Sequence, residues 1–425
     1  NADEMTISDG AILPLGGTIE NSGTIELTST GNETDLEILY QGAKLQGGGQ
    51  VLLSDSDRNV IFGGSADTVL TNVDNTISGA GQLDAGQMTL VNEGLILASG
   101  INSLVIDTGS NVIMNAGTLE ATGDGGLLVE SAINNTGHLW ANGGDITVNG
   151  DVTGAGDATI SGAATLEFGG ASAANTNFAD GGDGILSLEQ SSGFTGVVSG
   201  FNEGDAIDLG DVAFGNGTGT TIRYADNGTG TAGTLIVSDG SHTAYIAMEG
   251  QYTTAGFEGT YGQVSGTAVA YDSAHAGENY DQLVLGGTGN DVLTGDSWND
   301  LLVGGEGNDI LVGWLGNDTL NGGGGADTFV LSQTGTANAD HIVDYNALAG
   351  DKLDLSDMLD FNTGDDVLDF IKLTQDGDNT TVQVDVDGVA NGANFVDVCT
   401  LDHYGASGTD QVAVLIDGVD HNLAI

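Results

Sequence analysis

The chain has 425 residues, of which 61 are acidic and only 5 are basic, so its formal net charge is −56 at pH 7. This charge excludes nucleic acid as a partner, because phosphate contacts require Lys and Arg, and it argues equally against an anionic membrane surface. The 39% of hydrophobic residues exceed what a disordered chain carries, and the apolar set of Val, Ile, Leu and Ala with few aromatics favours thin solenoid cores over one globular core. No run of 18 apolar residues occurs, so we expect no transmembrane segment.

Residues 1–180 carry a loose repeat in which Asn, any residue and Gly precede a short alternating apolar strand. Copies begin at Asn21, Asn92, Asn115 and Asn135, and the last three start 23 and 20 residues apart (115 − 92 and 135 − 115). This period predicts the coils of an elongated, right-handed parallel β-helix, in which stacked Asn side chains form a hydrogen-bonded ladder. The region resembles the β-helical passenger regions of large bacterial adhesins. A β-sandwich of hairpins is the competing prediction.

Residues 181–275 and 331–425 share one order of features, which indicates an internal duplication. In each, an acidic turn is followed by a strand and a hairpin, closed at Asp239–Gly240 in the first copy and at Asp387–Gly388 in the second. Solenoid ends expose unpaired strand edges and an open core, so we expect both copies to be β-rich caps, the first also connecting two solenoids. A short helix is expected at residues 355–361.

Residues 276–330 contain five consecutive nonapeptides: GGTGNDVLT, GDSWNDLLV, GGEGNDILV, GWLGNDTLN and GGGGADTFV. Glycine at positions 1, 2 and 4 permits a turn with positive φ and converging carbonyls, and Asp at position 6 offers the hard oxygen that Ca²⁺ prefers. A large apolar residue at position 8 points inward from a very short strand. These inward residues are Leu293, Leu302, Leu311, Leu320 and Phe329.

The nonapeptides resemble the G-G-x-G-x-D-x-U-x repeat of RTX (repeats-in-toxin) proteins, a family of bacterial type 1 secreted proteins that bind calcium. The resemblance implies a parallel β-roll in which two nonapeptides make one coil. It also implies that each Ca²⁺ lies between stacked turns, held by two Asp side chains and by turn carbonyls.

The two edges of the implied β-roll differ in quality, because Trp298, Trp314 and Leu315 interrupt the turns on one edge only. We therefore expect one good calcium column and one poorer edge. The good column has Asp291, Asp309 and Asp327, and the poorer edge has Asp300 and Asp318. The turn residues implied to complete the sites are Gly286, Thr288, Gly304, Gly305, Glu306, Gly307, Gly323 and Gly325.

The chain after the repeats resembles the segment that follows RTX repeats in type 1 secreted adhesins. The shared residues are Asp340, Ile342, Asp344, Tyr345, Gly350, Asp351, Leu353, Asp354, Leu355 and Ser356. The resemblance places an uncleaved export signal in the final stretch, DQVAVLIDGVDHNLAI. The opening residues Asn1 to Met5 have neither the basic nor the apolar region of a signal peptide, so we expect a fragment or a processed product.

Catalytic patterns are missing from the sequence. The five basic residues and six histidines are dispersed, and neither HExxH nor GxSxG occurs. His138 alternates with Leu139 and is expected to face outward from a strand, and the lone Cys399 is expected to be a buried apolar residue. We therefore expect a protein that is not an enzyme.

The sequence predicts a secreted calcium-binding protein that folds on calcium after type 1 export and acts in cell-surface adhesion or the extracellular matrix. Expected partners are calcium ions, the type 1 secretion machinery, and cell-surface glycans or copies of the chain itself. One alternative is a calcium-dependent self-assembling surface-layer or filament protein. A second is a polysaccharide-active β-helix enzyme, because mannuronan epimerases also carry RTX modules and any carboxylate pair would be hidden among 61 acidic residues.

Overall fold

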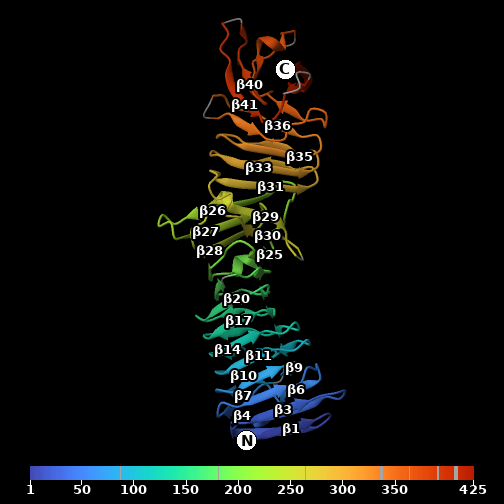
Figure 1. The fold of residues 1–425 in the computed structure, drawn as a ribbon, viewed down its shortest axis with the longest axis vertical. Helices are drawn as coiled ribbons and strands as arrows, with labels where there is room; N and C mark the ends of the chain where they lie inside the picture. Colours follow the sequence, from blue (N-terminus) through green and yellow to red (C-terminus); the bar gives the residue numbers. More distant parts are fainter. Residues whose placement is uncertain are drawn as a thin grey trace.

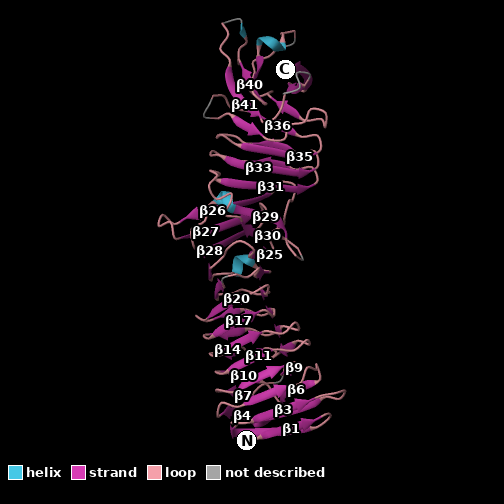
Figure 2. Ribbon diagram, in the orientation of Figure 1, coloured by secondary structure: helices cyan, strands magenta, loops and turns pink. Residues whose placement is uncertain are grey.

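The protein is an elongated rod of β-strands, with the N-terminus at one end and the C-terminal module at the other (Figure 1). The computed structural model describes residues 1–86, 88–179, 181–263, 265–335, 338–362, 364–389, 392–405 and 410–425. Within these ranges the helices are three short 3₁₀ segments, η1 (Ser191–Gly193), η2 (Thr254–Gly256) and η3 (Val367–Asp369) (Figure 2). The predicted all-β, elongated parallel architecture is confirmed.

The N-terminal half is a parallel β-helix in which a typical coil supplies one strand to a first sheet and two strands to a second. The first-sheet strands are β1 (Glu4–Ser8), β3 (Thr24–Thr28), β5 (Gln50–Leu53), β8 (Thr76–Gly79), β11 (Leu95–Ala98), β14 (Thr118–Ala121), β17 (His138–Asn142), β20 (Asp157–Ser161), β22 (Asn175–Phe178) and β24 (Val197–Ser199). The second-sheet strands are β2 (Ile12–Glu20), β4 (Thr34–Gln46), β6 (Asn59–Gly63), β7 (Val69–Asn72), β9 (Gly81–Leu83), β10 (Thr89–Asn92), β12 (Leu104–Ile106), β13 (Ile113–Asn115), β15 (Leu127–Val129), β16 (Ile133–Asn135), β18 (Ile146–Val148), β19 (Val152–Thr153), β21 (Thr165–Phe168), β23 (Ile185–Leu188) and β25 (Ala206–Leu209).

Stacked coils place like residues above one another. Ile96 pairs in register with Leu119, and Leu119 with Leu139, and all three side chains are fully buried in the core. Residues on either side point outward, as the period of two in a strand requires. His138 is one of these outward-facing residues, as predicted, and its side chain is partly exposed.

An asparagine ladder runs along one corner of the β-helix, as the sequence predicted. The Nδ2 of Asn72 donates to Oδ1 of Asn92 at 2.9 Å, Asn92 donates to Asn115 at 2.9 Å, and Asn115 donates to Asn135 at 2.8 Å. Asn21 joins this ladder through Asn75: its Nδ2 donates to Oδ1 of Asn75 at 2.7 Å, and the Asn75 N–H donates to Oδ1 of Asn72 at 3.1 Å. Because each buried amide is hydrogen-bonded by its neighbours, the ladder fixes the register of the coils. The parallel pairing of the strands shows that the competing prediction, a β-sandwich of hairpins, is wrong.

The parallel stacking continues beyond the boundary expected at residue 180, which itself lies outside the described residues. β23 pairs in parallel with β25, so the β-helix extends to Leu209. The Asn-x-Gly motif fades before this point, whereas the buried apolar residues of the coils continue through Leu186, Val198 and Ile207. Alternation of apolar residues therefore marks the end of the β-helix better than the corner motif does.

The first duplicated module joins the two solenoids as well as closing one of them. Its strands are β26 (Thr220–Asp226), β27 (Ala232–Ser238), β28 (Thr243–Glu249), β29 (Phe257–Tyr261) and β30 (Thr267–Tyr271). β28 pairs in parallel with β24 of the β-helix, and β26 pairs antiparallel with β31 (Gln282–Thr288), the first strand after the module. One 20-stranded sheet thus runs through the whole rod.

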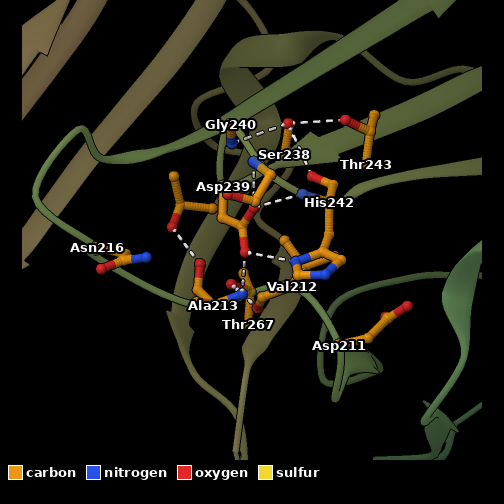
Figure 3. Close-up of polar contacts among 12 residues, drawn as sticks. Asp211, Val212, Ala213, Asn216, Ser238, Asp239, Gly240, His242, Thr243 and Thr267 are labelled. Atoms are coloured by element: carbon orange, nitrogen blue, oxygen red, sulfur yellow. Dashed lines mark hydrogen bonds and ion pairs between the residues drawn. The ribbon is translucent and has the colours of Figure 1, made fainter.

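The β27–β28 hairpin turns at Asp239, as predicted, and the carboxylate of Asp239 holds the loop that leaves the β-helix (Figure 3). Oδ2 accepts the Ala213 N–H at 3.0 Å, while Oδ1 accepts those of Ser241 and His242 at 2.7 and 2.6 Å. Burial opposes the charge of Asp239, but these backbone donors outweigh it and lower the pKa to about 2. Thr267 completes the arrangement by donating to the Val212 carbonyl.

An aromatic cluster closes the open core of the β-helix. Tyr252 lies 5.0 Å from Tyr271 and 6.3 Å from Phe201, measured between ring centroids, and Phe257 lies 5.1 Å from Tyr271. Tyr224 packs on both Tyr252 and Phe257. These rings belong to the same apolar core as the coils, so the module covers the surface that a solenoid end would otherwise expose.

The second solenoid is a parallel β-roll with a separate core. Its first-sheet strands are β31, β33 (Asp300–Glu306), β35 (Thr319–Gly324) and β37 (Asp340–Ile342), and its opposite sheet has β32 (Val292–Thr294), β34 (Ile310–Val312), β36 (Thr328–Val330) and β38 (Lys352–Asp354). β37 and β38 form a coil after the expected boundary at residue 330. The connections before and between these two strands are longer than those of the nonapeptides. The nine-residue repeat is therefore interrupted, and the sequence did not predict this coil.

The C-terminal module repeats part of the topology of the first. Its strands are β39 (Ile371–Asp376), β40 (Asn379–Val384), β41 (Val396–Leu401), β42 (Gln411–Ile416) and β43 (Val419–Ala424). β41 pairs in parallel with β37, as β28 does with β24, and the predicted export stretch forms the β42–β43 hairpin. Cys399 is fully buried, as expected.

The hairpin predicted at Asp387–Gly388 is present as the antiparallel pair β40–β41, whose connection contains these residues. That connection is longer than a tight turn, and the tight turn of this module lies between Asp376 and Asn379. The predicted helix needs correction. Residues 355–361 form no helix: residues 356–358 make a turn, in which Asp354 Oδ1 accepts the Ser356 N–H at 3.0 Å, and Leu355 is buried in the core. None of the helices in the described part of the chain has the length and apolar character needed to span a membrane.

Candidate metal centre

The turns of the β-roll owe their shape to glycine. At position 2, Gly287, Gly305 and Gly323 have φ of +90°, +105° and +88°, a region that L side chains rarely adopt. Trp314 occupies the same position in an interrupted turn and still adopts a φ of +67°. That turn therefore keeps its left-handed backbone in spite of its sequence.

Aspartates at position 6 form two columns, one on each edge. In the first column, the backbone N–H of Asp291 donates to Oδ1 of Asp309 at 2.8 Å, and that of Asp309 donates to Oδ1 of Asp327 at 2.8 Å. In the second column, the N–H of Asp300 donates to Oδ1 of Asp318 at 2.9 Å. The five predicted aspartates thus lie in the two columns that the resemblance implies.

Each column continues with an aspartate that the sequence did not assign to it. The N–H of Asp327 donates to Oδ1 of Asp351 at 3.0 Å, and that of Asp318 donates to Oδ1 of Asp340 at 3.1 Å. Spacings of 24 and 22 residues replace the regular 18. The Gly350–Asp351 pair resembles the glycine-lined turns, and this resemblance could have indicated that the column continues at Asp351.

The β-roll also contains a ladder of asparagines that was not predicted from the sequence. Asparagine at position 5 links the coils: Asn290 Oδ1 accepts the Asn308 N–H at 2.9 Å, and Asn308 Oδ1 accepts the Ala326 N–H at 2.8 Å. The opposite edge repeats this contact between Asn299 and Asn317 at 3.0 Å. Four of the five nonapeptides carry Asn at this position, which was the signal in the sequence.

The remaining carboxylate oxygens of the columns are buried and have no hydrogen-bond partner among the described residues. They are Oδ2 of Asp291, Asp309, Asp318 and Asp327, and Oδ1 of Asp300. An anionic oxygen buried without a donor is costly, so each must be neutralised by a cation or by a proton. The columns thus pass a chemical test for calcium, because Ca²⁺ binds carboxylate and carbonyl oxygens and both are present.

Glycine at position 1 brings carboxylate and carbonyl oxygens together. A Cβ on Gly304 would collide with Asp309 Oδ2 and with the Gly322 carbonyl oxygen. Gly295 has the same surroundings on the other edge, facing Asp300 Oδ2 and the Gly313 carbonyl. The absent side chain leaves the room in which these oxygens can converge on one ion.

The other predicted turn residues occupy positions 1 to 4 of the same turns. The carbonyl of Glu306 accepts the Gly289 N–H at 2.7 Å, and the side chains of Glu306 and Thr288 are exposed. Gly305 and Gly323 occupy position 2, while Gly307 and Gly325 occupy position 4 with φ near +145°. Gly286 occupies position 1 beside Asp291.

Burial raises the pKa of the column aspartates, and it does so most on the edge that was expected to be poorer. The pKa of Asp300 rises to about 7, that of Asp318 to about 6 and that of Asp340 to about 8, while Asp327 in the other column reaches about 6. Neighbouring carboxylates add to the effect at Asp340, where Asp318 is the contributor. Such groups exchange protons for a divalent cation near neutral pH.

The two interrupted turns differ from each other. Trp314 keeps the left-handed φ, whereas Trp298, which stands where the clean repeats have a left-handed glycine, does not. In the turn that contains Trp298, the Asp296 N–H donates to Oδ2 of Asp300 at 2.6 Å. The inequality of the two edges remains a prediction, now confined to the turn at residues 295–300.

Stacked glycine turns with two aspartate columns define a calcium-binding parallel β-roll. Residues 277–297 and 299–329 match the family described as RTX calcium-binding nonapeptide repeat (4 copies). The segment is therefore an RTX calcium-binding β-roll, a class typical of secreted proteins, and calcium is its cofactor.

No curated protein sequence matches the chain. Among solved structures, the chain is similar to the extracellular lipase LipA from Serratia marcescens at 15% sequence identity and a TM-score of 0.15. The match covers 75% of this chain and 44% of the lipase, so it spans less than half of that protein. A similarity at this level carries no argument about activity.

Proposed function

We propose that the chain is a secreted, calcium-dependent rod that acts in adhesion at the bacterial cell surface or in the extracellular matrix after type 1 export. The observation that carries the proposal is the pair of aspartate columns with buried, unpartnered oxygens. At neutral pH these columns favour the folded β-roll only where a divalent cation neutralises them. A role without catalysis is part of the proposal.

Folding of the β-roll depends on the calcium concentration, which differs between the cytosol and the outside of the cell. Extracellular calcium modules bind at about 10⁻⁴ to 10⁻³ M, far above the calcium concentration of a cytosol. An ion present at tenfold its dissociation constant adds roughly 1.4 kcal/mol per site, so three sites add about 4 kcal/mol. That amount is comparable with the stability of a small domain, so the β-roll would fold only outside the cell.

Circular dichroism tests this part of the proposal. The full chain is expected to lose β signal in EGTA and to regain it when calcium is returned. The β-helix, which contains neither aspartate column, should stay folded throughout and keep the emission of Trp140 unchanged. A β spectrum that EGTA leaves untouched would defeat the proposal.

An exposed groove on the β-helix supports a glycan as the adhesion ligand. It has a volume of about 520 Å³ and crosses β11, β14, β17 and β20. Two outward rows line it along the rod axis, one with Leu95, Thr118 and His138, the other with Glu120 and Trp140. An aromatic ring beside hydrogen-bonding groups suits a sugar, which presents both apolar and hydroxyl faces.

The groove holds its aromatic ring in place. Trp140 Nε1 donates to Ser161 Oγ at 3.0 Å, and His138 lies beside the indole with ring centroids 6.0 Å apart. His138 Nδ1 in turn contacts Asp157 Oδ1 at 2.8 Å. Because the chain carries a charge of −56, we propose a neutral or amino sugar in preference to a polyuronate.

A glycan panel probed with the calcium-loaded chain tests the groove. Trp140→Ala should weaken binding about thirtyfold, the effect of losing roughly 2 kcal/mol of aromatic contact. Trp298→Ala, an exposed aromatic on the β-roll, is the matched control and should leave binding unchanged. If both variants bind the glycan equally well, the groove is not the binding site. If the chain produces new reducing ends or unsaturated products from a glycan, the enzyme alternative is favoured.

Self-assembly is the second candidate, and exposed apolar side chains on one edge of the β-roll favour it. Trp298 is 66% exposed, Trp314 is 50% exposed and Leu315 is 43% exposed. Electron microscopy of the calcium-loaded chain distinguishes the candidates. Ordered sheets or filaments that disappear in a Trp298→Ser/Trp314→Ser double variant would favour assembly, whereas dispersed rods favour adhesion.

A further inference from the structure

A cluster of three metal-ligating side chains lies at the joint between the two solenoids, away from both aspartate columns. Glu258 comes from β29, Asp272 directly follows β30, and His275 lies in the turn that leads to β31. The backbone fixes the cluster: Asp272 N–H donates to the Gly256 carbonyl at 2.7 Å, and His275 N–H donates to the Asp272 carbonyl at 3.3 Å. The hairpin and the following turn therefore present all three side chains together.

The spacing of the side-chain atoms suits a transition metal. His275 Nδ1 lies 3.1 Å from Asp272 Oδ2 and 3.8 Å from Glu258 Oε1, and the three ligand atoms lie within 4.8 Å of one another. Ligand atoms bonded to a tetrahedral Zn²⁺ at about 2.0–2.2 Å are separated by roughly 3.4 Å. The measured separations of 3.1 and 3.8 Å bracket that value.

The cluster borders an open cavity and has little competing positive charge around it. A cavity of about 290 Å³ is lined by Glu258 and His275, and also by Glu278 and apolar residues such as Phe257. Arg223, the one arginine of this module, is engaged elsewhere by Asp281 at 2.9 Å. Water entering from this cavity would complete the coordination.

We propose that Glu258, Asp272 and His275 bind one divalent transition-metal ion of the Zn²⁺ type, independently of calcium. The imidazole is the discriminating ligand, because Ca²⁺ takes oxygen ligands whereas imidazole suits zinc, cobalt, nickel and copper. The bound ion ties the β29–β30 hairpin to the segment that enters the β-roll. It therefore fixes the joint between the solenoids.

The experiment uses the full chain saturated with calcium, so that the aspartate columns are already filled. Isothermal titration with Zn²⁺ should give one ion per chain, and Co²⁺ should give the visible absorption of a tetrahedral site. His275→Gln should lower the Zn²⁺ affinity by more than about tenfold and remove the Co²⁺ band. Glu258→Gln should weaken both signals, which provides a second variant if one of them misfolds.

His341→Gln is the matched control, because His341 is also about half exposed but, within the described parts of the chain, forms an ion pair with one carboxylate only, Asp402 at 3.6 Å. It should leave Zn²⁺ binding unchanged. Binding that survives His275→Gln would overturn the proposal. Release of calcium on adding Zn²⁺ would do so as well, since it would place the metal in the columns and not at the joint.

Discussion

The substitution Asp309→Asn separates the two roles of a column aspartate. Its Oδ1 accepts the Asp291 N–H at 2.8 Å, and an asparagine carbonyl can keep that bond. Its Oδ2 is buried without a partner, and the substitution replaces this oxygen with an amide nitrogen that cannot ligate calcium. The variant therefore keeps the hydrogen bond that joins the coils and removes the anionic ligand.

The effect on stability should change sign with calcium. Asp309 stands between Asp291 and Asp327, so its loss affects an ion on either side, and at tenfold the dissociation constant two ions contribute about 2.8 kcal/mol. Without calcium, burial raises the pKa of Asp309, so its ionised form costs the folded state free energy at neutral pH. Asparagine carries no charge, and the calcium-free β-roll should therefore become more stable.

Urea denaturation at pH 7.5, in 10 mM calcium and in EGTA, measures both effects. Trp298 and Trp314 lie in the β-roll and report its unfolding, and a Trp140→Phe background removes the signal of the β-helix. Asp67→Asn, at an exposed position on the β-helix, is the control for charge alone. The reasoning is refuted if Asp309→Asn destabilises the calcium-free chain or leaves the calcium increment intact.

Asp300→Asn completes the comparison. Because Asp300 closes the turn that lacks the left-handed backbone at Trp298, its loss should reduce the calcium increment less than the loss of Asp309 does. Equal losses would show that the two edges bind calcium equally well.

Three further outcomes are expected. The column aspartates have pKa values of about 6 to 8, so their protonation stabilises the calcium-free β-roll fully below pH 4 and this stabilisation is lost as the pH rises from 6 to 8. Circular dichroism in EGTA should therefore show more structure at pH 5 than at pH 8. Asn115→Ala should lower the free energy of unfolding of the β-helix by about 2 kcal/mol, because Asn92 and Asn135 lose their hydrogen-bond partner in the ladder. Asn134→Ala, at a half-buried position, should lower it little, and thermal melting measures both variants. Trp314→Gly should stabilise the calcium-loaded β-roll by about 1 kcal/mol in urea, because glycine adopts the left-handed φ freely; a loss of stability would show that indole packing outweighs this gain.

The sequence predicted those features that short-range patterns determine. The nonapeptides predicted the column aspartates, because each turn encodes its own backbone through glycine and its own ligand through Asp. The corner asparagines likewise predicted the β-helix ladder. In both cases one coil contains all the chemistry that it repeats.

Features that depend on the next coil were harder to predict. Asp340 and Asp351 extend the columns, yet inserted connections shift them out of the nine-residue rhythm. The cluster of Glu258, Asp272 and His275 depends on the pairing of β29 with β30, which no local motif records. The bridging role of β26 could not be predicted either, because a hairpin strand has two edges and the sequence does not say which of them finds a partner.

The pairing of β26 with β31 has a consequence for the calcium-free chain. When the β-roll melts, β26 loses the neighbour that covers its outer edge, and open backbone donors and acceptors appear in the middle of a molecule that is otherwise folded. An open edge of this kind invites pairing with another chain. The strong negative charge of the rod then protects it, since mutual repulsion keeps two bare edges apart until ions arrive to close them.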